Sequence, residues 1–397
     1  MSDLLTIEDA LSRILERARP LPTEMVPVGD AAGRVLREAA AAVVDLPPFA
    51  SSAMDGFALR ASDTPGTLAV AYRIAAGEPP PEPLPPGAAA GIATGATVPE
   101  GADAVVPIER AGDRGDRVEI PDGARPGQHV RPRGGDVRAG DSAVAAGTRL
   151  GPAQIGALGA AGVAEVCCSV RPRVVVLATG TELRPAGEAL SAGQIYESNR
   201  AMVGAALRPV GADVELLPVV EDDEIAHRAS LERALEADVL VSTGGVSMGP
   251  HDLVRRVAAD LGVEEIFWGV AVKPGKPLSF GIRGATLVFG LPGNPVSSLV
   301  GALVFIRPAL LRRQGIDTVE LDYDHGRTVA PLVRNPHRDE FVRARRRIEA
   351  TAVFLEPVAG QESHMIVRAA SADALVHVPR GAGEISAGAP VRFLSLV

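Results

Sequence analysis

The spacing of apolar residues changes twice along the chain. Near the N-terminus, apolar residues recur at helical spacing and predict an amphipathic helix that ends before Pro20: Leu4, Ile7, Leu11, Ile14 and Leu15. From about residue 26 to 150 the apolar runs are short and separated by Gly, Pro and Asp, which is typical of β structure. An Ala- and Gly-rich helix is expected at 152–161. Residues 1–170 therefore predict N-terminal linker and lid domains, with the lid at roughly 46–146.

Residues 171–316 have a different pattern, in which apolar strands alternate with helices. The run at 174–177 is continuously apolar, as in a strand buried on both faces. Further strands are expected at 213–219, 239–241 and 286–289, and helices at 198–207, 224–236, 253–261 and 296–311. This alternation predicts an α/β domain with a mostly parallel central sheet and helices on both faces. Ligands of such sheets bind at the carboxyl ends of the strands.

The last part of the chain, 317–397, has short strands and turns without a strong helix, which predicts a small C-terminal β domain, a barrel or a sandwich, of which the barrel is preferred. The fold class is therefore a multidomain combination of α/β and β structure.

Composition excludes several classes of protein. The 40 basic and 49 acidic residues give a net charge of −9, and aromatic residues are 3% of the chain, so a nucleic-acid-binding surface is not expected. In the cluster from Arg343 to Arg347, most members are expected to be solvated on a strand. The adjacent Cys167 and Cys168 fit buried thiols in a reducing compartment. With no signal peptide and with a longest apolar stretch (299–306) too short to span a bilayer, a cytoplasmic protein without a membrane partner is expected.

The two lysines are the most unusual feature of the composition. Of 40 basic Lys and Arg residues, only Lys273 and Lys276 are lysine, and both lie in the sequence Val272-Lys273-Pro274-Gly275-Lys276-Pro277. Lysine is a compact point charge suited to a small anion or phosphate, whereas arginine is a wide planar fork. Its retention within a Pro/Gly frame indicates an anion-binding loop, although chance retention on a solvated loop is the alternative.

Three Gly-rich turns follow expected strands of the α/β domain: 178–182, 242–247 and 291–295. Small residues at such positions let backbone N–H groups approach a phosphate or an oxyanion. Because the strands belong to one sheet, the three turns are expected to converge on one ligand cleft. They match neither the dinucleotide-binding fingerprint nor the P-loop, so those nucleotide folds are disfavoured.

Three carboxylates near these turns are candidate ligands for Mg²⁺: Glu182, Asp238 and Asp252. Mg²⁺ is typically held by one or two carboxylates together with substrate phosphates. Asp252 has an equally good structural role as the N-cap of the helix that starts at 253, and Asp238 has one in a turn. Glu182 is the least easily explained by structure alone.

Two strings in the N-terminal part also combine charge with tight turns. One is Ser52-Ala53-Met54-Asp55-Gly56-Phe57-Ala58, and the other is Arg131-Pro132-Arg133-Gly134-Gly135-Asp136. Taken alone, each is compatible with a solvated turn.

Together with further strings, these motifs resemble one known family, the molybdopterin molybdenumtransferases of molybdenum-cofactor synthesis. The resemblance runs through nearly the whole chain. It rests on the two N-terminal strings, Thr94-Gly95-Ala96 with 99–106, the three Gly-rich turns, Gly193-Gln194-Ile195-Tyr196-Glu197-Ser198-Asn199 and the lysine loop.

The resemblance implies a homodimer of four-domain subunits, in which the α/β domain of one subunit shares a cleft with the lid of the other. It implies adenylylated molybdopterin and molybdate as substrates, Mg²⁺ as cofactor, and release of AMP as molybdenum enters the dithiolene. A contact with the upstream molybdopterin adenylyltransferase is also expected.

By this resemblance, the catalytic residues are Asp55, Asp136, Glu182, Lys273 and Lys276, and the metal ligands are Glu182, Asp238 and Asp252. The implied substrate-binding residues are Thr94, Arg131, Thr179, Gly180, Gly244, Gly245, Ser247, Pro274, Gly275, Pro292, Gly293, Asn294, Ser297 and Arg343. Asp55, Thr94, Arg131 and Asp136 would come from the opposing lid, and Arg343, with Ser363, would approach molybdate from the C-terminal domain.

Two positions depart from the family pattern. Gly269 stands where a basic residue usually follows the aromatic pair Phe267-Trp268, and Arg255 or Arg256 is a candidate replacement. Glu362 stands where a small residue is usual. Two alternative functions are a molybdopterin adenylyltransferase, disfavoured by the additional N- and C-terminal domains, and a non-catalytic scaffold, disfavoured by the intact candidate site.

Overall fold

The computed structural model describes residues 4–220, 223–245, 253–349 and 352–396. The chain forms two compact units. The first comprises residues 1–24, 33–35 and 169–397, and the second comprises 25–32 and 36–168. The opening helix α1 (Ile7–Leu15) is present as predicted, but it belongs to the first unit and not with the rest of the N-terminal part.

The first unit contains the predicted α/β sheet. Its strands follow the order β16 (Asp213–Leu216), β13 (Arg173–Ala178), β17 (Val239–Thr243), β21 (Thr286–Leu291), β20 (Ser279–Arg283) and β18 (Glu264–Trp268). The first four are parallel, and the last two are antiparallel. The prediction of a mostly parallel sheet is therefore confirmed, but the antiparallel edge was not predicted.

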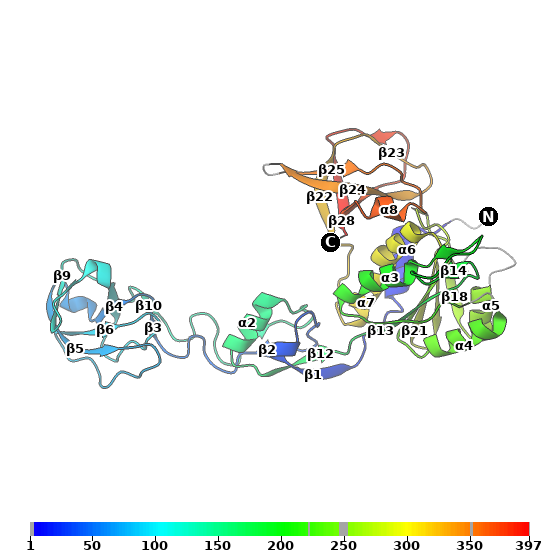
Figure 1. The fold of residues 1–397 in the computed structure, drawn as a ribbon. Helices are drawn as coiled ribbons and strands as arrows, with labels where there is room; N and C mark the ends of the chain where they lie inside the picture. Colours follow the sequence, from blue (N-terminus) through cyan, green and yellow to red (C-terminus); the bar gives the residue numbers. More distant parts are fainter. Residues whose placement is uncertain (1–3, 221–222, 246–252, 350–351, 397) are drawn as a thin grey trace. The chain divides into compact units, whose positions relative to one another are not determined.

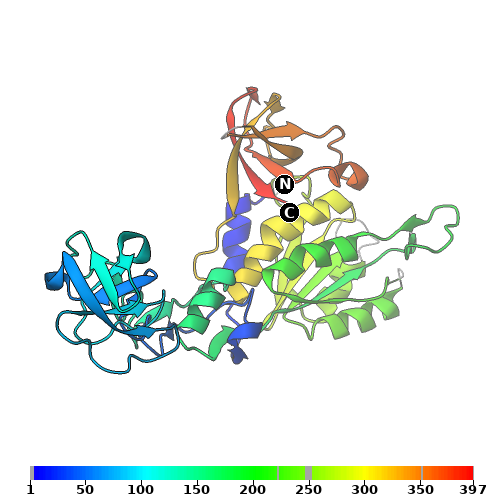
Figure 2. The same cartoon turned by 60° about the vertical axis from the view of Figure 1, so that its left-hand side comes forward.

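Helices cover both faces of this sheet (Figures 1 and 2). α1, α3 (Asn199–Leu207), α6 (Pro295–Gly301) and α7 (Arg307–Arg313) share one apolar core with the sheet, while α4 (Glu224–Ala234) and α5 (Leu253–Asp260) share another. Alternate residues of β13 enter the two cores: Val174 and Val176 the first, and Val175 and Leu177 the second. This division explains the continuous apolar run, since a strand buried on both faces needs no polar positions.

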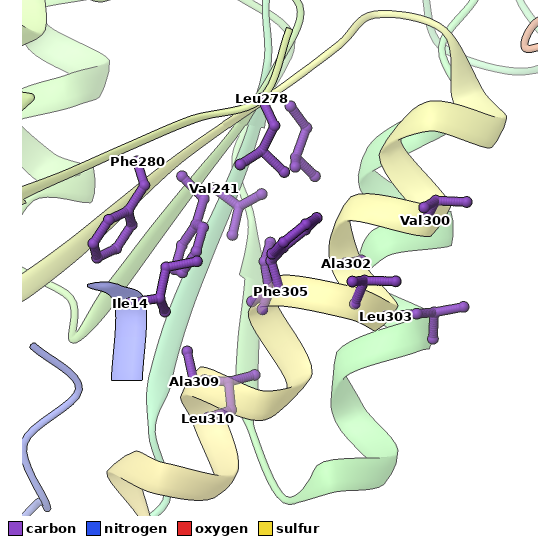
Figure 3. Close-up of a cluster of buried hydrophobic side chains, with 14 of the residues drawn as sticks. Ile14, Val241, Leu278, Phe280, Val300, Ala302, Leu303, Phe305, Ala309 and Leu310 are labelled. Atoms are coloured by element: carbon purple, nitrogen blue, oxygen red, sulfur yellow. The ribbon is translucent and has the colours of Figure 1, made fainter. Parts of the chain in front are cut away.

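The largest core is built around a long helical run (Figure 3). Residues Pro295–Arg313 join α6, a π-helical segment (Ala302–Ile306) and α7. Within the described part of the chain this is the one helix long and apolar enough to cross a membrane, but 72% of its most apolar window is buried inside the protein. Phe305, Ala309 and Leu310 face Val241, Leu278 and Phe280 of the sheet side. Burial of each large apolar side chain contributes about 1.5–3 kcal/mol, so the segment is accounted for as a core helix.

The C-terminal part forms the predicted barrel. Five strands close on themselves in the order β24 (Asp339–Glu349), β25 (Ala352–Pro357), β22 (Tyr323–Thr328), β28 (Pro390–Ser395) and β26 (Ala374–Val378), because β26 also pairs with β24. Smaller elements of this region are β23 (Leu332–Val333), β27 (Glu384–Ile385) and α8 (Ile366–Ala369). A strand from the α/β region, β19 (Val272–Lys273), pairs in parallel with β24. The lysine loop is therefore hydrogen-bonded to the barrel.

The second unit is built around a curled six-stranded sheet. Its order is β7 (Ala104–Pro107), β4 (Gly56–Leu59), β6 (Ala88–Ile92), β5 (Gly66–Ile74), β9 (Arg117–Ile120) and β8 (Gly112–Asp113). Separate cores lie on its two faces, with Phe57 in one and Ala58 in the other. Further elements are β1 (Thr23–Pro27), β2 (Ala40–Ala41), β3 (Ser51–Ser52), β10 (Val130–Arg131), β11 (Ser142–Val144), α2 (Pro152–Ala160) and β12 (Glu165–Ser169). Cys168 is buried among apolar residues of β12 and α2, as expected of a structural thiol.

Candidate active site

The three Gly-rich turns meet at the carboxyl edge of the α/β sheet. The Thr179 N–H donates to the Thr243 carbonyl oxygen (3.3 Å), and the Gly244 N–H donates to the Leu291 carbonyl oxygen (3.0 Å). These bonds extend the parallel ladders just beyond the ends of β13 and β17. The turns therefore lie side by side, as the sequence pattern predicted.

Gly244 shows why this edge requires glycine. Its φ of +89° lies in the left-handed region, and a Cβ at this position would be 2.9 Å from the Thr179 carbonyl oxygen. Gly293, in the turn after β21, packs against Gly244. A Cβ added at Gly293 would lie 3.8 Å from the Gly244 Cα. The three backbones approach closely, leaving an edge formed mainly by main-chain groups.

Glu182 lies on the turn that follows β13. Its side chain is exposed and folds back over Gly180, because a Cβ at Gly180 would be 2.6 and 2.7 Å from the two carboxylate oxygens. The Glu182 carbonyl oxygen accepts a hydrogen bond from the Ile195 N–H (2.9 Å), which ties the turn to β15 (Ile195–Tyr196) beside β14 (Leu183–Arg184). The structure therefore places a solvent-accessible carboxylate directly on the Gly180 turn.

The lysine loop lies against the first turn of α6. Gly275 is buried with φ +114°, and its Cβ would lie 3.6 Å from the Ser297 carbonyl oxygen. Since α6 begins directly after Pro292, Gly293 and Asn294, the lysine loop and the third Gly-rich turn are neighbours. The structure thus brings together the predicted residues around Lys273, Gly244 and Ser297.

The two lysines differ in their surroundings. The Lys273 Nζ lies 2.9 Å from Glu340 Oε1, and β19–β24 pairing sets these two residues opposite each other. Lys276 is exposed, and its backbone carbonyl oxygen accepts from the Val270 N–H (3.0 Å). Glu340, whose side chain is 13% exposed, was not predicted as part of the site. Glu340 precedes Phe341 and lies in none of the motifs named above, so the sequence does not indicate this contact.

Asn199 is a second residue at this edge, after Glu340, that was not predicted as a site residue. Its Nδ2 donates to the Gly293 carbonyl oxygen (2.8 Å), while its Oδ1 is buried without a hydrogen-bond partner among the described residues. A buried amide oxygen without a donor costs about 1–3 kcal/mol. Asn199 therefore holds the Gly293 turn and presents an unused acceptor beside it.

Arg343 differs from its expected role as an exposed anion contact. Its side chain is buried and donates to the Gln361 Oε1 and to the carbonyl oxygens of Gly360, Glu362 and Met365, at 2.9–3.3 Å. Burial lowers the pKa of the guanidinium from its ordinary value. In this structure the arginine holds the 360–365 segment, and it offers no free face to an anion.

That segment in turn reaches the site through Ser363. The Asn294 Nδ2 donates to the Ser363 Oγ (2.8 Å), and the Val296 N–H donates to the Ser363 carbonyl oxygen (3.1 Å). Ser363 therefore caps the start of α6, next to the Gly293 turn. The C-terminal domain therefore contacts this edge through Ser363, and Arg343 holds the 360–365 segment that carries Ser363.

Asp238 lies at the wrong edge of the sheet for the predicted metal site. It precedes β17, and its carboxylate accepts from the Arg173 N–H (2.8 Å) and from the Arg313 Nη2 (3.3 Å). Residues at the start of β17 are separated from Gly244 by the length of the strand, about 16 Å at 3.3 Å per residue. Asp238 therefore bonds to the start of β13 and to the buried Arg313 at the amino edge of the sheet. This placement contradicts a role beside the Gly-rich turns.

Two predicted residues, Ser247 and Asp252, lie outside the described residues. Among the residues that are described, no group of three or more His, Cys, Asp or Glu side chains forms a metal cluster. The acidic residues that follow Val220 in the sequence were not predicted as candidate site residues. The Val220 carbonyl oxygen accepts from the Gly180 N–H (3.1 Å), and Asp223 then caps α4 by accepting from the Ala226 N–H (2.8 Å).

In the second unit, Asp55 and Thr94 contact each other. The Thr94 N–H donates to Asp55 Oδ1 (2.6 Å), and hydrogen bonds from Thr94 lower the pKa of the Asp55 carboxyl. Arg131, on β10, lies opposite Ser51 of β3, whose neighbour Ser52 accepts from the Gly95 N–H (2.8 Å). Asp55, Thr94 and Arg131 are therefore exposed side chains on adjoining segments.

Asp136 is exposed on the turn after Arg133, and its N–H donates to the Leu46 carbonyl oxygen (2.9 Å). The turn is organised by Asp45, which the sequence analysis did not consider. Asp45 accepts from the Ala139 N–H (2.9 Å) and from the Arg133 Nε (2.5 Å), and these bonds lower the pKa of its carboxyl. Arg133 is therefore committed to Asp45, which leaves Asp136 as the carboxylate presented by this turn.

Comparisons with known proteins match the chain along almost its whole length. Residues 5–162 match the MoeA N-terminal region (domain I and II), 175–312 a probable molybdopterin binding domain, and 326–396 the MoeA C-terminal region (domain IV). Molybdopterin molybdenumtransferase 2 of Mycobacterium tuberculosis is 38% identical over 402 residues, covering 97% of each chain. The chain belongs to the molybdopterin molybdenumtransferase family. The molybdopterin molybdenumtransferase of Haemophilus influenzae is also 38% identical, over 79% of this chain and 78% of its own.

Solved structures agree with this assignment. Two crystal structures of the molybdopterin biosynthesis MoeA protein of Pyrococcus horikoshii match with TM-scores of 0.80 and 0.85, at 31% and 28% identity. Each match covers at least 98% of this chain and 99% of the other. The predicted family is therefore confirmed in both sequence and fold.

The departure at Gly269 from the molybdenumtransferase pattern has a local explanation. Gly269 has φ +88°, and a Cβ there would lie 2.8 Å from the Leu4 side chain, so a larger residue would be strained. Of the two candidate replacements, Arg255 pairs with Glu265 (2.8 Å) and lies over the ring of Trp268, directly before Gly269, with its Cζ 5.8 Å from the ring centroid. Arg256 pairs with Glu224 (2.5 Å).

A cavity of about 330 Å³ adjoins the carboxyl edge on the α5 face of the sheet. Its lining is mostly apolar, including Val254, Phe280 and Val288, with Ser242 and Arg255 among its polar members. Its volume is within the range of small-molecule sites, which usually combine apolar walls with a few polar groups. In this member of the molybdenumtransferase family, the apolar cavity therefore lies beside Ser242 and Gly290, close to the ends of β17 and β21, where two of the Gly-rich turns follow.

Proposed function

We propose that this protein inserts molybdenum from molybdate into adenylylated molybdopterin and releases AMP. Water hydrolyses the phosphoanhydride to AMP and molybdopterin phosphate, and the two dithiolene thiols bond to molybdenum as one molybdate oxygen leaves with their two protons as water. Membership of the molybdopterin molybdenumtransferase family supports the insertion of molybdenum. The observation that carries the proposal is the convergence of the lysine loop and three Gly-rich turns at one sheet edge.

Electrostatics makes this edge suitable for the substrates. Both are anions, and gathering them in one place requires fixed positive charge and hydrogen-bond donors. Lys276 is exposed for such a contact, and Lys273 holds its charge beside Glu340. We propose that the two lysines bind the oxyanions, with backbone groups of Thr179, Gly180, Gly244, Gly245, Pro274, Gly275, Pro292, Gly293, Asn294 and Ser297 shaping the rest of the site.

The second unit supplies the other proposed residues. Asp55, Thr94, Arg131 and Asp136 are exposed side chains, which suits groups that act on a ligand. We propose that they complete the cleft of a partner subunit in a homodimer. Delivery of the reactive substrate by the upstream molybdopterin adenylyltransferase is part of the same proposal.

Mg²⁺ fits the residues only together with substrate. The Glu182 carboxylate is accessible on the Gly180 turn, but the described residues offer no complete cage. One carboxylate plus substrate phosphates is the usual way in which Mg²⁺ is bound. We propose that Glu182 holds Mg²⁺, which when bound would neutralise phosphate charge. Asp238, at the opposite edge of the sheet, is not part of this site.

The decisive experiment mixes purified protein with adenylylated molybdopterin, Mg²⁺ and molybdate, and follows AMP and active cofactor. We expect AMP release that depends on molybdate. Release without molybdate dependence, or none, would refute the proposal. Formation of adenylylated molybdopterin from ATP and molybdopterin would instead identify an adenylyltransferase.

Binding without turnover would identify a non-catalytic scaffold. A matched protein with Lys276→Gln serves as the control, since it should bind less anion while retaining the same fold.

A further inference from the structure

The barrel carries a second group of basic side chains, remote in sequence from the lysine loop. His325 on β22, Arg392 on β28 and His377 on β26 lie opposite one another across three neighbouring strands. Directly opposed side chains in a sheet are about 4.5–5.5 Å apart. The three side chains are therefore neighbours in one row on the barrel.

This row lines a cavity of about 440 Å³. Arg334 adds a further cation, and the other walls include Pro379, Ile385 and Val391. None of the described residues that line the cavity is acidic. In a chain with a net charge of −9, such a segregation of positive charge is not a consequence of composition.

The two arginines of the cavity are not neutralised by carboxylates. No ion pair found in the described part of the chain includes Arg334 or Arg392. By contrast, Arg346 and Arg347 on the same barrel pair with Asp373 and Glu349. Among the described residues, the two arginines of the cavity therefore have no carboxylate partner.

Arg392 is also held in place. Its Cζ lies 4.7 Å from the Tyr323 ring centroid, and its Nη2 lies 3.3 Å from His377 Nδ1. Since arginine can only donate, His377 Nδ1 must accept, and the ring proton then resides on Nε2 and points to Asp339 Oδ1 (3.2 Å). This arrangement leaves His377 neutral and fixes Arg392, which lines the cavity, against Tyr323 and His377.

We propose that this cavity binds a small organic anion, a phosphate monoester or carboxylate with an apolar body. Arg334 and Arg392 would bind the charged group, since their planar forks match such oxyanions. The apolar walls would contact the body of the ligand, and the volume suits one small molecule. The site is separate from the lysine loop and does not depend on the function proposed above.

Calorimetric titration of the full chain with phenyl phosphate tests the proposal. A Lys276→Gln background weakens anion binding at the lysine loop, and the arginine variants made in this background assign the remaining binding to the barrel. We expect one site whose affinity falls at least about tenfold in Arg392→Gln and in Arg334→Gln, because each loses a charge-assisted hydrogen bond. Arg347→Gln, on the same barrel but paired with Glu349, is the matched control and should bind normally.

Three results would overturn the proposal: no binding in the Lys276→Gln background, unchanged affinity in the Arg334→Gln variant, or equal binding of neutral phenol. Arg334→Gln is the critical variant because Arg334 makes no stacking contact comparable to that of Arg392 with Tyr323. Loss of activity in Lys276→Gln with intact phenyl phosphate binding would show that the two sites are independent.

Discussion

Replacing Arg343 with leucine is expected to destabilise the barrel and loosen the segment that reaches the candidate active site. The guanidinium donates to four acceptors in residues 360–365, at 2.9–3.3 Å. Each acceptor left buried without a donor costs about 1–3 kcal/mol, but the segment can relax, so the costs are not additive. We expect a net loss of about 3–5 kcal/mol, comparable to breaking other buried charged networks.

Hydrogen–deuterium exchange is the most direct assay, because it reports the segment itself. We expect faster exchange across 360–370 and a melting temperature lower by roughly 6–20 °C in Arg343→Leu. Arg345→Leu is the matched control on the same strand: Arg345 is exposed and donates from Nε to the Ser371 carbonyl oxygen. It should cost no more than about 1.5 kcal/mol. Equal effects of the two variants, or unchanged exchange in the segment, would refute the structural role of Arg343.

Three further outcomes are expected. Lys276→Arg should lower turnover at least about tenfold with unchanged circular dichroism, because a planar fork replaces a compact charge; near-normal turnover would contradict this. Gly244→Ala should destabilise the protein more than Gly262→Ala in thermal melts, since both have positive φ but only Gly244 also meets a carbonyl oxygen, at 2.9 Å. Burial lowers the pKa of His377 in the folded state from its ordinary value of 6.5. The unfolded chain therefore takes up the proton first, so the free energy of unfolding is highest above pH 6.5 and decreases as the pH falls. His377→Gln should therefore flatten the decrease in melting temperature as the pH falls below 6.5; an unchanged slope would contradict it.

The predictable parts of the fold follow from apolar periodicity. β13 and β17 enter two cores with alternate residues, so their continuous apolar runs identified a sheet covered on both faces. The antiparallel β18 and β20 were missed because Glu264 and Glu265 in β18 and Arg283 in β20 interrupt the apolar pattern. Of these two strands β18 is the edge strand, and edge strands need less burial, so its sequence carries less signal.

The site residues were predictable where they follow a strand and not where they precede one. Thr179 and Gly244 come at carboxyl ends, and parallel pairing brings such ends together. Asp238 is only six positions before Gly244, but the residues between them form β17. The two residues therefore lie at opposite ends of this strand. Contacts between separate regions, such as Lys273 with Glu340, had no local signal at all.

The contact between Lys273 and Glu340 also separates the roles of the two lysines. Lys273 belongs to a strand that pairs with the barrel, and a carboxylate 2.9 Å away partly offsets its charge. Lys276 has no such partner among the described residues and is more exposed. Under the proposed function, an incoming anion would therefore compete with Glu340 for Lys273 but meet Lys276 directly. The proposal then assigns the first electrostatic contact to Lys276, while the position of Lys273 depends on the barrel to which its strand is hydrogen-bonded.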